Sequence, residues 1–204
     1  MNEWLANLKA RNENDEMKNK ASTFNFLRPS HEVAYQLIGA TFTVNGVGGI
    51  IVETEAYDQL DPASHTFVGP TKRNAAMFGL AGCVYVYRSY GIHWCLNFVC
   101  EAEGHGAGVL IRAIEPIIGL QTMYDRRGVN DVRLLCSGPG KLGQALAIVH
   151  NYNGMPLNKS PFELIPAKKP VDVICGPRIG ISKAVDVPWR FGLSGSPFLS
   201  RPFR

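Results

Sequence analysis

The sequence predicts an α+β fold: a single compact domain with a mixed, largely antiparallel β-sheet, flanked by helices and carrying an exposed β-hairpin. Short runs rich in β-branched and aromatic residues outnumber the helical patterns and do not alternate with them regularly. Turn signals at Asn45-Gly46 and at Arg88-Ser89-Tyr90-Gly91 join such runs into hairpins. The chain has 204 residues, 46% of them hydrophobic and 19% charged, which is enough for one domain with a sizeable core.

The N-terminal part predicts a polar arm followed by one short helix. Residues 1–22 are polar and balanced in charge, so they are interpreted as an arm, and residues 23–204 as the folded domain. Ser30 has a side chain suited to an N-cap, which predicts a helix over about residues 31–37. Gly39 then ends this helix, because glycine readily takes the left-handed conformation found after helices.

The next segment predicts a β-hairpin. Residues 41–44 and 50–55 are strand-like, and Asn45-Gly46 between them is the strongest short turn signal. The pair Gly48-Gly49 could suggest a phosphate-binding loop, but no helix or lysine follows it. A bulged turn is therefore the better interpretation.

The rest of the chain predicts further strands and two more helices. In chain order these are a hairpin over residues 84–97, a strand over 109–114, a helix from Pro116 to about Arg127 closed by Gly128, a helix from Pro139 to about Ile148, and strands near 178–182 and 190–193. The N–H groups at the start of the helix at Pro139, together with Lys141, could hold a phosphate. A plain helix start with a solvated lysine is an equal alternative, and the spacing does not decide between them.

Positive charge is segregated along the chain. The net charge is +4, and residues 62–100 contain no Asp or Glu but include Lys72, Arg73 and Arg88. Gly91 allows a tight turn that leaves Tyr90 near the tip of the hairpin, where it meets solvent. An aromatic tip beside basic, acid-free flanks is the outline of a nucleic-acid-binding surface.

The cysteines and the N-terminus indicate an intracellular protein. The five cysteines are odd in number, form no C-x-x-C pair and fall mostly in apolar runs, so neither a disulfide framework nor a metal site is expected. The first residues lack the pattern of a signal peptide, and no apolar run is long enough to span a membrane.

Two carboxylates and one arginine are the strongest candidates for chemistry. Period-two alternation places Glu53 and Glu55 on one face of a strand. The two could also be exposed acids at a strand end, or a carboxylate pair that hydrolyses a sugar. Arg112 lies alone in an apolar run and needs a carboxylate partner if it is buried. Glu53 and Glu55 are the attractive partners, although Glu115 is nearer in sequence. A carboxylate held by arginine suits a base that activates water.

Aromatic and polar side chains could line a slot beside this pair. Tyr85 and Tyr87 share one face of a strand, and Asn97 lies on the face opposite its apolar neighbours in the next strand. His65 lies in a turn-like segment, where a histidine is more often solvent-facing than catalytic. Tyr57, His65 and Tyr87 could line one aromatic slot, but spacing alone does not show that they converge.

Blocks that run in order from about Ser30 to the C-terminus resemble the alkyladenine (3-methyladenine) DNA glycosylase family. They are Ile51-Val-Glu-Thr-Glu-Ala-Tyr57, Lys72-Arg-Asn-Ala-Ala-Met-Phe78, Val84-Tyr-Val-Tyr-Arg-Ser-Tyr-Gly91, Val109-Leu-Ile-Arg-Ala-Ile-Glu-Pro116, Cys136-Ser-Gly-Pro-Gly-Lys-Leu142 and Gly195-Ser-Pro-Phe198. The resemblance implies the single-domain α+β fold already predicted.

The resemblance also implies a role for each candidate residue. Glu55 is similar to a general base that activates the hydrolytic water, with Arg112 beside it. Tyr57 and Tyr87 are similar to residues that stack on the flipped base, and His65 is similar to one that contacts the base by its edge. Asn97 is similar to a residue that discourages guanine by crowding its exocyclic amine. Tyr90 is similar to the residue that fills the gap left in the duplex, which makes its hairpin DNA-inserting. The basic residues Lys72, Arg73, Arg88 and Lys141 are expected to contact the DNA backbone.

The expected function is the excision of alkylated or deaminated purines from double-stranded DNA, which leaves an abasic site. No lysine stands at the matched pocket positions, so direct hydrolysis by a monofunctional enzyme is expected. The protein is also expected to be a monomer and to use no cofactor. One alternative is a catalytically inactive lesion- or structure-specific DNA-binding protein. Another is a hydrolase of free nucleosides, which would make poor use of Tyr90 and the arginines.

Overall fold

The computed structural model describes residues 24–203, and the predicted arm at residues 1–22 lies outside them. The helices of this part are α2 (Ser30–Gln36), α3 (Leu120–Arg127) and α4 (Pro139–Ala145), with short 3-10 turns η1 (Ala75–Phe78), η2 (Val132–Leu134) and η3 (His150–Tyr152). The strands are β1 (Thr41–Val44), β2 (Val47–Tyr57), β3 (Val84–Ser89), β4 (His93–Val99), β5 (Gly108–Ile118), β6 (Phe162–Ile165), β7 (Val173–Gly176) and β8 (Arg190–Leu193).

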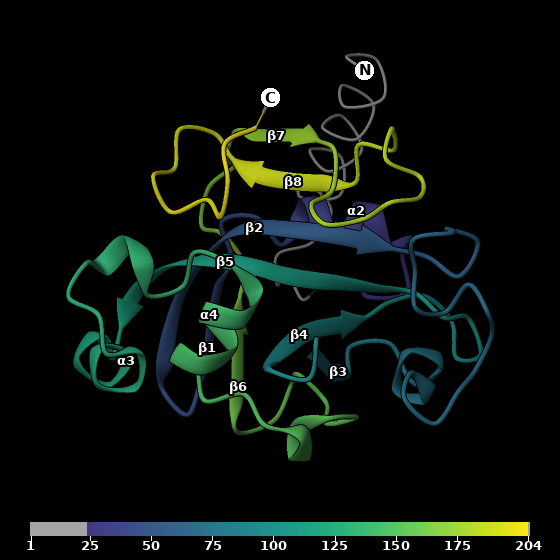
Figure 1. The fold of residues 1–204 in the computed structure, drawn as a ribbon, viewed down its shortest axis with the longest axis horizontal. Coiled ribbons are helices and arrows are strands. Elements are labelled where there is room, and N and C mark those ends of the chain that lie inside the picture. Colours follow the sequence, from purple (N-terminus) through teal and green to yellow (C-terminus); the bar gives the residue numbers. More distant parts are fainter. Residues whose placement is uncertain (1–23, 204) are drawn as a thin grey trace.

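One curled sheet contains these strands. Its main order is β3-β4-β5-β2-β1-β6, and β8 pairs with both β2 and β7. Figure 1 shows β2 and β5 as the long central strands, with β7 and β8 on one side and β3 and β4 on the other. Every strand pairing among residues 24–203 is antiparallel. The predicted α+β class is confirmed.

The two faces of the sheet differ in chemistry, and this difference creates the site. On one face, alternate side chains of β3, β4 and β5 join the hydrophobic core; they are Val84, Val86, Leu96, Phe98, Val109 and Ile111. Helix α2 packs on the same face, where the Thr54 hydroxyl of β2 donates a hydrogen bond of 2.9 Å to the carbonyl of Ala34. The side chains in between therefore point to the opposite face.

The structure corrects the predicted start of the second helix. Pro116 lies in β5 opposite Gly49 of β2, and α3 begins only at Leu120. A register shift between Gly48 and Gly49 accommodates the proline, which is tolerated in a sheet where the pairing is irregular. A Cβ on Gly49 would lie 1.9 Å from the Glu115 carbonyl oxygen, so the glycine allows the close approach. Gly48-Gly49 is thus part of a strand and not a turn.

Other boundaries also differ from the predictions. Ser30 is the first buried residue of α2 rather than its cap, and its hydroxyl has no partner among the described residues. The helix that begins at Pro139, as predicted, ends at Ala145, because the backbone soon turns to a positive φ of 52° at Ala147. No strand forms at residues 178–182, where Gly180 has a φ of 78°, whereas β6 and β7 were not predicted. Across residues 24–203, no helix combines the length and the apolar content needed to cross a membrane.

Candidate active site

A pocket of about 570 Å³ lies on the face of the sheet opposite the core, a volume typical of small-molecule sites. Three of its lining residues, Tyr85, Asn97 and Leu110, belong to a row that crosses four adjacent strands and ends at Glu55. In this row Tyr85 of β3 pairs with Asn97 of β4, Asn97 pairs with Leu110 of β5, and Leu110 pairs with Glu55 of β2. Strand alternation thus brings residues that are far apart in the sequence to one surface.

Glu55 lies fully buried at the centre of a hydrogen-bond cluster. Its Oε2 accepts bonds from Arg112 Nη1 at 3.1 Å and from the Tyr57 hydroxyl at 2.8 Å, and its Oε1 accepts one from Ile179 N at 2.7 Å. Burial lowers the pKa of Arg112, but the charges of Glu55 and then Glu53 outweigh it and raise that pKa overall. The arginine therefore stays charged beside the carboxylate, and the expected pairing of Arg112 with Glu55 is confirmed.

Glu53 has a different set of partners from Glu55, although both lie on the same face of β2. Its Oε1 accepts bonds from Arg190 Nε at 2.7 Å, from Arg112 Nε at 3.2 Å and from the Ser200 hydroxyl at 2.8 Å, and its Oε2 accepts one from Ser200 N at 2.5 Å. Neither glutamate lines the pocket, but the three partners of Glu55 do, whereas of the partners of Glu53 only Arg112 does. Glu53 therefore joins β2, β5, β8 and the C-terminal segment to one another.

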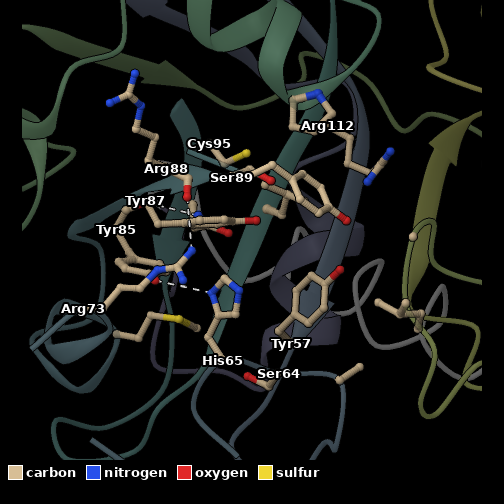
Figure 2. A pocket seen from close by; sticks show the side chains of 18 of the residues that line it. Tyr57, Ser64, His65, Arg73, Tyr85, Tyr87, Arg88, Ser89, Cys95 and Arg112 are labelled. Atoms are coloured by element: carbon tan, nitrogen blue, oxygen red, sulfur yellow. Dashed lines mark hydrogen bonds between the residues drawn. The ribbon is translucent and has the colours of Figure 1, made fainter. Parts of the chain in front are cut away.

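Three aromatic rings form one wall of the pocket. Tyr85 and Tyr87 stack with their centroids 5.5 Å apart, and the His65 ring meets Tyr87 edge-on at 4.6 Å. Figure 2 shows His65 next to the Tyr85–Tyr87 pair and Tyr57 beyond His65, on the side away from Tyr85. Burial raises the pKa of Tyr85 to about 12 and that of Tyr87 still further, so both phenols remain neutral. Uncharged, electron-rich rings suit a flat aromatic ligand.

Asn74 fixes the loop that carries His65. Its side-chain amide donates to the carbonyls of His65 at 2.8 Å and Gly69 at 3.0 Å, and its oxygen accepts from Thr71 N at 2.6 Å. The loop residue Thr66 also donates to the Gly106 carbonyl at 2.7 Å. These bonds hold His65 in the lining of the pocket, where its side chain is also exposed to solvent, as expected for a histidine in a turn-like segment.

The ionisation of His65 gives a testable pH dependence. Burial lowers the pKa of His65, and the nearby Arg73 charge lowers it further. A histidine with a lowered folded-state pKa stabilises the fold above its unfolded pKa of about 6.5, and this contribution is lost as the pH falls through the folded pKa. We therefore expect the free energy of unfolding of the wild type to fall relative to that of His65→Gln between about pH 7 and about pH 5. Urea unfolding at both pH values measures this, and a constant difference would contradict it.

Asn97 and Tyr90 lie at different depths. Asn97 is buried in the pocket floor and donates a hydrogen bond of 3.1 Å to the Tyr85 carbonyl. Tyr90 is 91% exposed at the tip of the β3–β4 hairpin, where it and Gly91 have φ values of 48° and 70°. Two successive positive φ values are those of a tight hairpin turn. The expected exposure of the aromatic tip is confirmed.

The basic candidates do not form one group. Arg73 and Arg88 line the pocket, where the guanidinium of Arg73 lies 5.6 Å from the Tyr87 ring and donates to the Arg88 carbonyl. Arg88 lies 5.7 Å from the ring of Trp94. Lys72 is exposed, and Lys141 donates a hydrogen bond of 3.3 Å to the Ser137 hydroxyl outside the pocket lining. Their role as DNA-backbone contacts stays a prediction.

Several contributors were missed in the sequence. Cys95, Leu110 and the segment 179–181 line the pocket, and Arg190 binds Glu53. The reasoning that gave Arg112 a carboxylate partner also applies to Arg190, which is a lone charge in an otherwise apolar strand. Residues 179–181 carried no comparable signal, because Ile179 contributes its backbone N–H rather than its side chain.

One cluster among residues 24–203 has side chains suited to a metal ion. Asp58, Glu101 and His105 offer ligand atoms within 4.8 Å of one another, and none of the three lines the pocket. His105 Nε2 lies 2.7 Å from Asp58 and 3.2 Å from Glu101, so the histidine itself bridges the two carboxylates. These contacts account for the closeness of the three side chains without a metal.

The fold and the pocket define an α+β protein that can enclose a flat ring beside a buried carboxylate. Comparison with known proteins gives the family. The sequence model of the family described as Methylpurine-DNA glycosylase (MPG) matches residues 24–197. The chain therefore belongs to the methylpurine-DNA glycosylase family.

Bacterial relatives match over most of their length. A protein of Nitrosospira multiformis named "Putative 3-methyladenine DNA glycosylase" is 66% identical over 182 residues, which cover 89% of this chain and 94% of that protein. Proteins of the same name from Rhodopseudomonas palustris and Rhizobium meliloti are each 59% identical over 179 residues, which cover 88% and 87% of this chain and 89% and 95% of those proteins.

Proposed function

We propose that this protein is a DNA glycosylase of base-excision repair that flips alkylated or deaminated purines out of duplex DNA and hydrolyses their N-glycosidic bond. The observation that carries this proposal is the fully buried Glu55, which is bound by three residues that line the pocket, Arg112, Tyr57 and Ile179. Family membership supports the reaction class, and the names of the relatives support 3-methyladenine as a substrate.

Glu55 is the proposed base that activates the hydrolytic water. Its Oε2 already accepts two bonds, from Arg112 and from Tyr57. Oε1 accepts one bond, from Ile179 N, and is therefore the oxygen proposed to bind the water molecule. Arg112 and the Ile179 N–H fix the plane of the carboxylate, which leaves little freedom in where that water lies.

The aromatic wall is the proposed binding site for the flipped base. Extrusion of a nucleotide costs a few kcal/mol, less for a base that pairs poorly, and stacking between Tyr57 and Tyr87 compensates for this cost. His65 would meet the edge of the base, and Asn97 would crowd the exocyclic amine of guanine. An alkylated purine is often cationic and is then already a good leaving group, whereas hypoxanthine would need a proton.

The proposed enzyme is monofunctional. Strand cleavage by a bifunctional glycosylase requires an amine that forms a Schiff base with the sugar, and no lysine occurs among the described residues that line the pocket. Water activated by Glu55 would instead give a free base and an intact strand with an abasic site. We also propose a monomer that acts inside the cell without a cofactor.

A panel of duplexes tests the function. Each duplex carries one lesion, such as 3-methyladenine, 7-methylguanine or hypoxanthine, and the undamaged duplex and the free nucleosides serve as controls. We expect release of the free base from at least one damaged duplex and none from undamaged DNA. Tight, salt-sensitive binding without release from any lesion would favour an inactive DNA-binding protein. Turnover of nucleosides but not of DNA would favour a nucleoside hydrolase.

Tyr90 is the proposed residue that fills the gap left by the flipped nucleotide. Replacement by alanine is expected to weaken capture of a lesion in duplex DNA by about tenfold, because one stacking contact is lost. The loss on single-stranded DNA should be smaller, because no gap in a base-pair stack has to be filled there. Binding titrations on matched duplex and single-stranded lesions measure the difference. Ile165→Ala, at the far edge of the sheet, is the control, and equal losses on both substrates would refute the gap-filling role.

A further inference from the structure

Arg178 is a buried cation that the proposed mechanism does not use. Its side chain has no exposed surface, and Nη1 donates to the Ala56 carbonyl at 2.9 Å and forms an ion pair with Asp61. Its Nε and Nη2 have no hydrogen-bond partner among residues 24–203. Unpaired buried N–H groups are costly, so their presence calls for an explanation.

Two aromatic faces take the place of the missing acceptors. The guanidinium carbon of Arg178 lies 4.8 Å from the centroid of the Tyr57 ring and 5.5 Å from that of Trp189. The guanidinium is therefore within cation–π distance of two rings, each of which attracts a cation. An apolar side chain could fill the same space without the desolvation cost of a charge. Packing alone does not account for an arginine here.

Arg178 also connects three parts of the site. It covers one face of Tyr57, and it binds Asp61. In the loop that leads to His65, the carbonyl of Asp61 accepts a bond from Ser64 N at 2.9 Å, and its carboxylate accepts one from Ala63 N at 3.0 Å. The next residue, Ile179, donates its N–H to Glu55. A displacement of Arg178 would therefore also displace the Tyr57 ring, the loop that carries His65 and the backbone N–H that binds Glu55.

The contact with Tyr57 has an electrostatic consequence. Tyr57 lines the pocket and Arg178 does not, so the guanidinium covers the face of the ring that a bound base cannot use. A cation on one face of a ring withdraws electron density from the other face and repels a second cation placed there. The ring of Tyr57 is then a weaker partner for a cationic base than a tyrosine without such a neighbour, whereas stacking with a neutral base is little affected.

We propose that Arg178 is a positioning and specificity-determining residue, which fixes Tyr57 and shifts the selectivity of the pocket from cationic, alkylated purines toward neutral damaged purines. This inference rests on the proposed glycosylase function. It assigns Arg178 no contact with DNA and no step in the chemistry.

Selectivity between a cationic and a neutral lesion tests the proposal. Single-turnover base release is measured on duplexes that carry 7-methylguanine or hypoxanthine, for the wild type and for Arg178→Met. The ratio of the cationic to the neutral rate should rise about fivefold in the variant, since the repulsion across the Tyr57 ring is removed. A purely structural defect would lower both rates together and leave the ratio unchanged.

Three further variants show whether a change in the rate ratio comes from the charge of Arg178. The double variant Asp61→Asn/Arg178→Met removes the ion pair as a unit, so that no buried carboxylate is left without a partner. Arg178→Lys retains the charge but not the planar stack, and it should lower both rates with little change in the ratio. Lys183→Met removes a positive charge from an exposed position in the same segment and should behave like the wild type.

The outcomes separate this inference from the function on which it rests. An active wild type whose rate ratio is unchanged in both Arg178→Met and the double variant would overturn the specificity role. A wild type that releases neither base would refute the proposed function itself. A ratio that rises in both variants but not in Lys183→Met is the result that we expect.

Discussion

Replacement of Glu55 by glutamine is expected to slow base release from damaged duplex DNA by about a thousandfold, the scale of a lost general base. The amide can still accept the bond from Ile179 N, which lies at 2.7 Å from Oε1. It cannot take a proton from water, so the defect should lie in the chemical step. Single-turnover kinetics on one lesion-containing duplex, with the enzyme in excess, measure this rate directly.

Binding and folding controls make this result specific. Glu55→Gln should still bind the lesion duplex, because the stacking residues Tyr57 and Tyr87 and the exposed Tyr90 remain. Glu163→Gln makes the same chemical change at an exposed position of β6 and should keep the wild-type rate. Equal rates for Glu55→Gln and the wild type would remove Glu55 from the proposed mechanism.

Replacement of Glu53 by alanine is expected to lower the free energy of unfolding by about 3–5 kcal/mol, the scale of a broken buried ion pair. Glu53 is fully buried and accepts bonds from two arginines, Arg112 and Arg190, and from both the N–H and the hydroxyl of Ser200. Its loss would leave two buried cations with fewer partners and would detach the C-terminal segment from β2. Urea unfolding measures the change.

Two comparisons identify the cause of this loss. Glu53→Gln keeps acceptors for Ser200 but not the charge, so its effect should be smaller than that of the alanine variant. Glu163→Ala, at an exposed position of β6, should change the free energy of unfolding by less than about 0.5 kcal/mol. If Glu53→Ala were no more destabilising than Glu163→Ala, the four contacts of Glu53 would contribute nothing to stability.

The two carboxylates of β2 show which part of the site could be predicted from the sequence. Alternation predicted that Glu53 and Glu55 share a face, and the apolar neighbours of Arg112 predicted that it needs an acidic partner; the structure confirms both. The division of their roles was out of reach, because it depends on Arg190 and Ser200, which lie more than a hundred residues further along the chain. Local patterns show that a charge must be paired but do not identify a distant partner.

Errors in the predicted elements have a similar origin. Pro116 is a good first residue for a helix, yet the pairing of β5 with β2 continues past it because glycines on β2 allow the close approach. Residues 178–182 have the apolar content of a strand, but Arg178 is instead held by Asp61 and the ring of Tyr57. Tertiary contacts decide both cases against the local preference.

The most direct test of the proposed hydrolysis measures both products of one reaction. A duplex with a single hypoxanthine or 7-methylguanine is incubated with the wild-type protein, and free base and abasic sites are quantified in the same sample, with and without borohydride. We predict equal amounts of base and abasic site, an intact strand and no protein–DNA adduct after reduction. Failure to release base from either lesion would contradict the proposed glycosylase function, and a trapped adduct would contradict direct attack by a water activated by Glu55.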